Sequence, residues 1–351
     1  MPRLTKFLWV GCVLAAAFGA REAASAEKIV WDIAIYGPPR EVTTQIEYVA
    51  KYIEEKSNGN FTFKLHYGES ISPAKAMLDS LKIGAIHGAF ATFTYVPGKT
   101  PLHLALDLPY LPVPDLDTWQ KVQEKFYAWE PIKKELEKWN GVALYATLLP
   151  PYEFMGTGNA PKTLDDWKGM RVRALGPHGD AMRTLGAVPT SVPAPEVYTA
   201  LERGTFQAAS FPFSYSFGAY RLYEVSNWYT MGMQFAIVNS AWVFSKKDYD
   251  RLPAEYKKLL DEARPGQYEV VKKAYKEADK KYIPMFDKAG LERITFTPEM
   301  LAAFQEKAGR PVWDKWVKEN EAKGLPAKET LDFVLKTIEE VTGKEATAKG
   351  G

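Results

Sequence analysis

The chain has 351 residues, with 45 basic and 43 acidic side chains and a formal charge of +2. This balance argues against nucleic acid or an acidic membrane surface as a partner, since both call for a basic field. The only cysteine, Cys12, lies in a segment that we expect to be removed, so disulfides and cysteine-based catalysis are excluded from the mature protein. The length exceeds what one hydrophobic core usually supports and indicates two lobes.

The amino terminus has the parts of a secretory signal peptide. Arg3 and Lys6 precede an apolar run from Phe7 to Ala20, and Ala24-Ser25-Ala26 supplies small residues for cleavage. The run is shorter than the roughly 20 residues that span a bilayer. We therefore expect residues 1–26 to be removed and the mature protein to be periplasmic, with 42 basic and 42 acidic side chains. A retained signal anchor is the alternative.

Strands and helices alternate along the first part of the mature chain. Residues 29–35 place Ile29, Trp31, Ile33 and Ile35 at every second position, and residues 61–67 alternate apolar with polar side chains, which is typical of strands. Residues 42–53 place apolar side chains at helical spacing, and Ser72 and Gly84 bound a second predicted helix. Strands and helices in this order imply parallel strands joined by right-handed crossovers. The sequence therefore predicts an α/β structure for the first lobe.

The same alternation returns further along, before the chain changes to long helices. Two strands and two helices are predicted, over residues 142–148, 170–175, 178–185 and 195–203. After about residue 253 the sequence is rich in Lys, Glu, Ala and Tyr. One long helix is predicted over residues 253–288, which Pro265 could kink.

Two lobes without an obvious tether suggest a chain that crosses between them more than once. We assign residues 27–149 to the first lobe, completed by residues from about 236 to 275. Residues 150–235 form the second lobe, completed by residues from about 276 to 343. Residues 344–351 are rich in Lys, Gly and Ala and are expected to be frayed.

Known catalytic sequence patterns are absent. The chain has no G-x-S-x-G, H-E-x-x-H or phosphate-binding loop sequence. The histidines lack the spacing of metal ligands, and zinc needs three or four convergent donors. They are His66, His87, His103 and His178. We therefore expect no metal ion and no cofactor, and a binding protein instead of an enzyme.

A short basic strand stands out after a turn at residues 164–169. On a strand, Arg171 and Arg173 point to the same face. An arginine at the carboxyl end of a strand in an open α/β sheet lies where such folds bind ligands. Its guanidinium matches a carboxylate through two parallel hydrogen bonds. Arg173 is thus a candidate for binding a carboxylate. The alternatives are a solvated arginine at the sheet edge and an ion pair between the lobes.

Several short sequences carry a family resemblance through their order and spacing. They are Tyr67-Gly68-Glu69, Gly88-Ala89-Phe90, Leu108-Pro109-Tyr110-Leu111, residues 164–173, Pro195-Glu196-Val197-Tyr198-Thr199-Ala200-Leu201 and Asn239-Ser240-Ala241-Trp242. With the signal peptide and the opening strand, they resemble the extracytoplasmic solute receptors of tripartite ATP-independent periplasmic (TRAP) transporters, of the C4-dicarboxylate-binding DctP type. The resemblance runs through essentially the whole mature chain.

The resemblance implies a fold, a partner and a set of site residues. The fold would be α/β, a two-lobed periplasmic binding protein fold with hinge strands and a long helix spanning both lobes. The partner would be a sodium-driven membrane permease. In the family, the arginine that matches Arg173 forms the ion pair with the substrate carboxylate. Glu196 matches a glutamate that supports the site, and Asn239 is a further candidate ligand-binding residue. We expect a monomer with no nucleic acid partner.

Departures from the family pattern bear on the ligand. Phe211 stands where many members have an asparagine, and the tryptophan-glutamate pair that binds a cation in some members is absent. A second basic residue that grips sialic-acid-type ligands is missing near Phe154. Phe211, Phe213 and Tyr215 are interpreted as sharing one strand face, where an aromatic stripe could also be core packing.

Aromatic side chains recur in the other segments that should face the cleft, namely Tyr36, Phe93, Tyr95 and Phe154. Several rings that converge on one arginine suit a flat or apolar acid, since ligand pockets are mostly apolar with few orienting polar groups. The favoured ligand is an aromatic or hydrophobic monocarboxylate. A C4-dicarboxylate and a hydroxy or 2-oxo acid are the alternatives.

Two alternative functions would use further residues, and a third would use the same pocket. A dicarboxylate needs a second donor, for which Arg40 and Arg171 are candidates, although both are expected at the surface. A periplasmic enzyme would use Glu196 and His178, but no activated nucleophile or matched acid-base pair is visible. A sensor partner for a membrane kinase would use the same pocket as a transport receptor.

Overall fold

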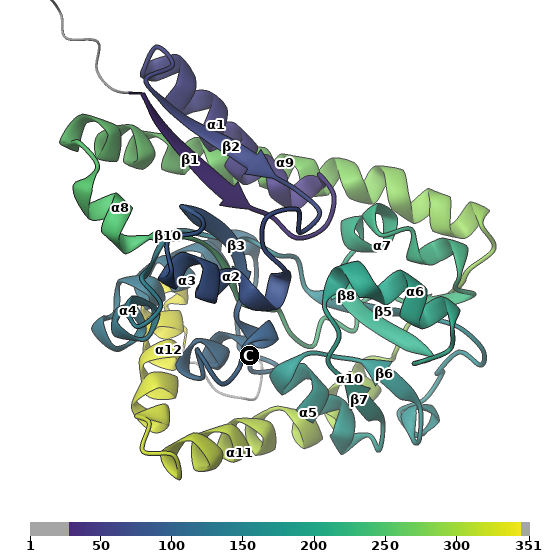
Figure 1. Ribbon diagram of the computed structural model, residues 1–351. Helices are drawn as coiled ribbons and strands as arrows, with labels where there is room; N and C mark the ends of the chain where they lie inside the picture. Colours follow the sequence, from purple (N-terminus) through teal and green to yellow (C-terminus); the bar gives the residue numbers. More distant parts are fainter. Residues whose placement is uncertain (1–27, 345–351) are drawn as a thin grey trace, which may run out of the picture.

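The computed structural model describes residues 28–344, which fold around two β-sheets (Figure 1). The predicted signal peptide lies outside the described residues, as do residues 345–351 of the predicted tail. No helix within residues 28–344 combines the length and the hydrophobicity that crossing a bilayer requires. Helices pack on both sheets, so the α/β class and the two-lobed arrangement expected from the sequence are confirmed.

The first sheet has the strand order β2-β1-β3-β10-β4. Its strands are β1 (Ile29–Ala34), β2 (Phe61–His66), β3 (Gly88–Thr92), β4 (Gly141–Ala146) and β10 (Ser240–Ser245). β1 pairs in parallel with β2 and β3, whereas β10 runs antiparallel to β3 and β4. A segment from late in the chain is thus inserted between two strands of the first half. We call the part built on this sheet lobe I.

The second sheet has the strand order β11-β9-β5-β8-β6-β7. Its strands are β5 (Tyr152–Gly156), β6 (Arg171–Arg173), β7 (Val188–Thr190), β8 (Ala208–Pro212), β9 (Trp228–Thr230) and β11 (Glu292–Ile294). β6 lies parallel to β7 and β8, and β5 runs antiparallel to β8 and β9. We call the part built on this sheet lobe II.

Helices cover both sheets. Those of lobe I are α1 (Thr44–Lys56), α2 (Met77–Lys82), α3 (Leu116–Ala128), α4 (Glu130–Glu137) and α8 (Lys246–Arg251). Those of lobe II are α5 (Gly176–Thr184), α6 (Val197–Glu202), α7 (Tyr215–Ala219) and α10 (Pro298–Ala308).

The carboxy-terminal helices return to lobe I. α11 (Arg310–Glu321) leads from α10 to α12 (Ala327–Thr342), and α12 packs against α3 (Figure 1). The sequence assigned residues 276–343 to the second lobe, and the structure places α12 with the first. The apolar stripe of α12 predicts a helix with one buried side, but the stripe itself does not identify the surface that it covers.

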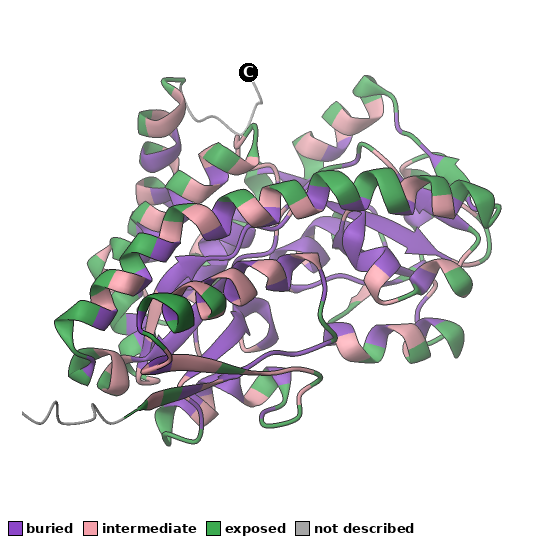
Figure 2. Ribbon diagram, turned by 90° about the horizontal axis from the view of Figure 1, so that it is seen from above, coloured by how far each residue is buried: buried purple, intermediate pink, exposed green. Residues whose placement is uncertain are grey.

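One long helix runs along both lobes, as the family resemblance implied. α9 (Ala254–Lys288) packs against α1 in lobe I and α7 in lobe II. The helix continues through Pro265, and one of its sides is buried while the other faces solvent (Figure 2). Gly266 permits a close approach to α1, because a Cβ atom there would lie 2.1 Å from the Tyr48 hydroxyl.

A second glycine sets the distance between α7 and α9. A Cβ atom at Gly218 would lie 2.1 Å from two ring carbons of Tyr282. Overpacking of this kind typically costs about 1–3 kcal/mol, so we expect Gly218→Ala to lower the free energy of unfolding by that amount. Urea denaturation would measure it, with Gly98→Ala as the control, since no atom lies within 4 Å of the corresponding position at Gly98. Equal stability of the two variants would contradict this account of the contact.

Candidate functional site

A cavity lies between the two lobes. It is lined by residues of several strands and of the segments that follow them. Its lining residues are Tyr36, Arg40, Phe90, Thr92, Tyr95, Leu149, Tyr152, Arg173, Ala194, Phe211, Pro212, Tyr215, Ser216 and Tyr220. We call it the arginine cavity. Its volume is only about 20 Å³. The side chains of the two lobes therefore nearly fill it in this conformation.

Arg173 ends strand β6 and is 1% exposed. Its Nε donates to the Val192 carbonyl at 2.9 Å and its Nη1 to the Ser210 carbonyl at 2.6 Å. The guanidinium carbon lies 4.5 Å from the centre of the Phe211 ring. Backbone carbonyls and an aromatic face thus fix the plane of the guanidinium.

Arg173 has no ion-pair partner among residues 28–344. Its burial excludes a solvated arginine at the sheet edge, and the missing partner excludes an ion pair between lobes within the described residues. Nη2 contacts the Tyr95 hydroxyl of lobe I at 3.5 Å, and that hydroxyl also accepts the Ala194 N–H at 3.0 Å. A buried cation without a counter-ion is costly, so the site is suited to an anion.

Arg40 also lines the arginine cavity, which corrects the expectation that it lies at the surface. It is 8% exposed, and its Nη1 donates to the carbonyls of Tyr36 and Pro38, each at 2.9 Å. Its guanidinium carbon lies 5.1 Å from the Tyr36 ring centre and 5.5 Å from that of Tyr220. Arg171 is exposed, as expected, and donates to backbone carbonyls outside the cavity.

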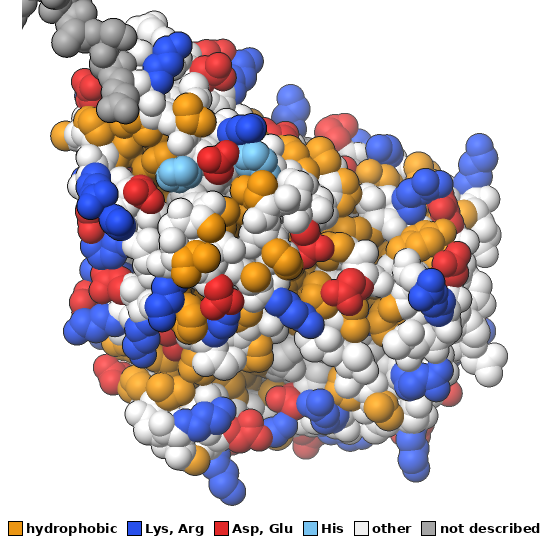
Figure 3. Space-filling model, in the orientation of Figure 1, with side chains coloured by type: hydrophobic (Ala, Val, Ile, Leu, Met, Phe, Trp, Pro, Cys, Tyr) orange, Lys and Arg blue, Asp and Glu red, His pale blue; other side chains and the backbone are white. Residues whose placement is uncertain are grey.

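The cavity differs in charge from the outer surface. Figure 3 shows Lys and Arg interspersed with Asp and Glu over one face of the molecule. The arginine cavity instead has two basic side chains and no acidic one among its lining residues. An anion would find an unopposed positive charge inside this cavity, whereas charges of both signs are mixed on the face in Figure 3.

The structure brings together five of the predicted site residues. They are Tyr36, Tyr95, Arg173, Phe211 and Tyr215. Sequence reasoning did not select Phe90, Tyr152 and Tyr220 for the site. Phe90 lies in one of the sequences that carry the family resemblance, and Tyr220 closes an aromatic-rich stretch, so both had a weak signal.

Tyr220 brings an unpaired hydroxyl to the cavity. The Oη atom is buried and has no hydrogen-bond partner among the described residues. Burial raises the pKa of Tyr220, an effect that the nearby Arg40 opposes. The hydroxyl therefore stays protonated and is available as a donor.

Phe93 and Phe154 are buried away from the arginine cavity. The centre of the Phe93 ring lies 4.2 Å from the centre of the His103 ring. The centre of the Phe154 ring lies 4.8 Å from the ring centre of Trp167 and 5.7 Å from that of Phe235. Phe93 begins a short 3-10 helix after β3 and Phe154 lies in β5, and both are fully buried core side chains within a lobe.

Asn239 and Glu196 do not line the cavity either. The Asn239 amide nitrogen donates to the His103 carbonyl at 2.9 Å, and its oxygen accepts from Gln123 and Tyr127 inside lobe I. Glu196 is exposed beside the start of α6. Asn239 thus satisfies a buried polar network, and Glu196 faces solvent.

The predicted aromatic strand face is also corrected. β8 ends at Pro212, and Tyr215 is already the first residue of α7. Phe213 packs on Tyr229, whereas Tyr215 lines the cavity and stacks on Tyr275 of α9. A change of backbone direction after β8 separates side chains that a continuous strand would have placed side by side.

The residues of the enzyme alternative are not brought together. His178 is fully buried between the rings of Tyr152 and Phe235, whereas Glu196 is exposed. Burial lowers the pKa of His178 to about 3, and Arg173 acts in the same direction. The imidazole is therefore neutral and has no acid-base partner in the described residues. No group of three or more metal-ligating side chains was found there either.

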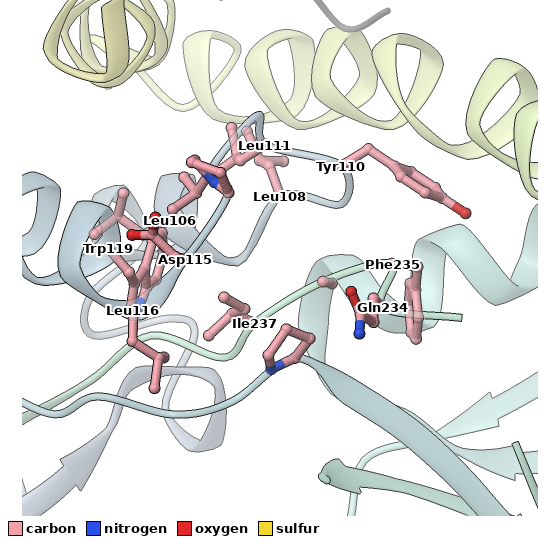
Figure 4. A pocket seen from close by; sticks show the side chains of 14 residues that line it. Leu106, Leu108, Tyr110, Leu111, Asp115, Leu116, Trp119, Gln234, Phe235 and Ile237 are labelled. Carbon is pink, nitrogen blue, oxygen red and sulfur yellow. The ribbon is translucent and has the colours of Figure 1, made fainter. Parts of the chain in front are cut away.

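A larger cavity of about 380 Å³ lies beside residues 234–237, which lead from lobe II back to β10 (Figure 4). Apolar side chains such as Leu106, Trp119 and Phe235 line it. Asp115 is its one acidic side chain, and none of its described lining residues is basic. This cavity therefore offers no positively charged partner for a carboxylate among its described lining residues.

Comparison with known proteins places the chain in a family. Residues 36–320 match the family model described as bacterial extracellular solute-binding protein, family 7, or DctP. A solute-binding protein of Albidiferax ferrireducens is 26% identical over 281 residues, which cover 78% of this chain and 80% of that protein.

Solved structures of TRAP solute-binding proteins share the fold. One from Rhodoferax ferrireducens, with copurified benzoate, has a TM-score of 0.80 at 17% identity and covers 90% of this chain and 99% of its own. One from Sulfurospirillum deleyianum, with bound succinate, has a TM-score of 0.74 at 20% identity, with the same coverage. The family match extends over most of the chain, so this protein belongs to the DctP-type solute-binding receptors of TRAP transporters, which are binding proteins and not enzymes.

Proposed function

We propose that this receptor binds a flat aromatic carboxylate in the arginine cavity and delivers it to the TRAP membrane permease. Arg173 would donate to the carboxylate, with the rings of Tyr95, Phe211 and Tyr215 around the body of the ligand. The observation that carries the proposal is the burial of Arg173 in an aromatic cavity without a counter-ion among residues 28–344.

The charge of Arg173 supports an acid as the ligand. Removing a cation from water is expensive unless an anion and hydrogen bonds compensate for it. Two carbonyls accept from Nε and Nη1, but they carry no formal charge. A carboxylate would supply the missing charge and accept hydrogen bonds from the guanidinium.

The rings support a flat ligand. Aromatic side chains come from both lobes, with Tyr36 and Phe90 on one side and Phe211 and Tyr220 on the other. Such rings stack on a planar ligand and exclude water from its charged end. A TRAP solute-binding protein of the same fold was solved with benzoate.

Ligand entry requires the lobes to separate, because the free space is small. We propose that residues 147–151 and 231–239, which cross between the two sheets, act as the hinge. Tyr95 of lobe I contacts Arg173 and Ala194 of lobe II, so these contacts would form on closure. We further propose a periplasmic monomer, released by cleavage after residue 26.

A thermal-shift panel tests the proposal on protein purified from the periplasm and stripped of ligand by reversible unfolding. Benzoate and 3-hydroxybenzoate should raise the melting temperature and be recovered unchanged. A ligand at 100 times its dissociation constant adds about 2.7 kcal/mol to the free energy of unfolding. Succinate, pyruvate and galacturonate complete the panel. A shift confined to these three would contradict the aromatic ligand.

A further inference from the structure

We infer that Arg40 forms a second anion subsite in the arginine cavity, so that the preferred ligand is an aromatic acid with two negatively charged groups. The inference rests on the proposed function, because it adds a second contact to the same ligand. It narrows the substrate class from aromatic monocarboxylates to aromatic diacids.

The first observation is that Arg40 is buried without a counter-ion. No ion pair joins it to an acidic side chain of residues 28–344, and its side chain is 8% exposed. The two carbonyl contacts use Nη1, and no hydrogen bond of Nε or Nη2 is found in the described residues. These two nitrogens are a pair of donors with the spacing that a carboxylate accepts.

The second observation is the aromatic setting of this guanidinium. The rings of Tyr36, Phe90 and Tyr220 lie 5.1, 5.4 and 5.5 Å from its central carbon. They hold the group in place and compensate part of its charge, although less than an anion would. An anion in contact with Arg40 would therefore have a rigid partner that needs no rearrangement.

The third observation is a further donor beside Arg40. A Cβ atom at Gly37 would lie 2.2 Å from the Tyr220 hydroxyl and 3.0 Å from Nη1 of Arg40, so both groups converge on this glycine. Gly37 has a φ of +71°, which also favours glycine there. The Tyr220 hydroxyl is buried and unpaired in the described residues. A neutral donor, the Tyr220 hydroxyl, therefore lies beside the Arg40 guanidinium.

The two arginines come from different lobes. Arg40 follows β1 of lobe I, and Arg173 ends β6 of lobe II. Lobe closure brings both cations into one cavity that has no acidic lining residue. A ligand with an acidic group at each end would neutralise both and link the lobes, whereas a monocarboxylate would leave one cation uncompensated.

The test compares benzoate with isophthalate, which has the same ring and a second carboxylate. Isothermal titration calorimetry on the wild-type protein should show isophthalate binding at least about 10-fold more tightly, as expected for one added charge-assisted contact. In Arg40→Gln, isophthalate should lose about 10-fold to 100-fold in affinity, and benzoate much less. The difference between the two ligands should therefore disappear.

Arg40→Lys and Arg171→Gln separate a binding role from a structural one. Lysine keeps the charge but not the planar pair of donors, so it should retain part of the preference for isophthalate. Arg171→Gln, outside the cavity, should retain all of it. Equal affinities of the wild-type protein for benzoate and isophthalate would overturn the inference and leave the proposed function intact. Equal losses of both ligands in Arg40→Gln and Arg40→Lys would also overturn it, because Arg40 would then only support the fold of its loop.

Discussion

Replacing Arg173 with glutamine should weaken the binding of benzoate by on the order of 100-fold or more. Removing one partner of a buried, hydrogen-bonded charge pair typically costs about 2–5 kcal/mol, and about 1.4 kcal/mol corresponds to a factor of 10. Arg173 is 1% exposed and has no acidic partner in residues 28–344, so no neighbouring charge would replace it. Isothermal titration calorimetry would measure the change.

Arg171→Gln is the matched control for this variant. Arg171 lies two residues earlier on the same strand, is exposed, and donates to the carbonyls of Thr205 and Gly204. The Arg171→Gln variant should bind benzoate with the affinity of the wild-type protein. The affinity of Arg173→Lys for benzoate should fall between those of Arg173→Gln and Arg171→Gln, since lysine keeps the positive charge but lacks the planar pair of donors. Unchanged affinity in a folded Arg173→Gln variant would refute the role given to this residue.

The stability of the protein should fall between about pH 4.5 and pH 7 because of Glu153. This side chain of β5 is buried, and burial raises the pKa of Glu153 from 4.5 to about 7. The Thr230 hydroxyl and the N–H groups of Gly232 and Gln234 donate to the carboxyl oxygens and only partly oppose the effect of burial. Glu153 thus ties β5 to the start of a segment that crosses between the lobes.

The direction of this change in stability follows from the raised pKa of Glu153. Below pH 4.5 the carboxyl is protonated in both the folded and the unfolded protein, and its contribution to stability is complete. As the pH rises towards 7, the unfolded chain releases the proton while the folded one retains it. The free energy of unfolding should therefore drop by on the order of 3 kcal/mol across this window and level off above it.

Urea denaturation at a series of pH values would test this. Glu153→Gln keeps an oxygen acceptor for both N–H groups and cannot ionise, so the difference between the wild type and this variant isolates Glu153. Glu137→Gln, at an exposed position, controls for the loss of a surface charge. If the wild-type and Glu153→Gln profiles ran parallel between pH 4.5 and 7, the carboxyl would not be the cause.

Local periodicity was sufficient to predict several elements of the fold. The helix predicted over residues 253–288 is α9 (Ala254–Lys288), and the strand predicted over residues 61–67 is β2 (Phe61–His66). These predictions succeed because a helix or strand with one buried side needs apolar residues at a fixed interval. The insertion of β10 between β3 and β4 could not be predicted in this way, because it depends on contacts distant in sequence.

In the candidate site, too, local sequence features were predictable and contacts between distant segments were not. Arg173 was selected from a glycine-led basic strand and a family motif, both of which are local in sequence. Arg40 was placed at the surface, since its burial requires Phe90 and Tyr220, which are far from it in the chain. Phe154 was placed in the pocket, but it packs on Trp167 inside lobe II.

The sequence by itself determined the class of the protein, the positions of several helices and strands, and one arginine suited to a carboxylate. The tertiary structure alone decided which rings surround that arginine and that a second arginine joins it from the other lobe. The physical reason is that spacing along the chain encodes which side of an element is buried. The surface that meets that side is set by packing between segments that lie far apart in the sequence.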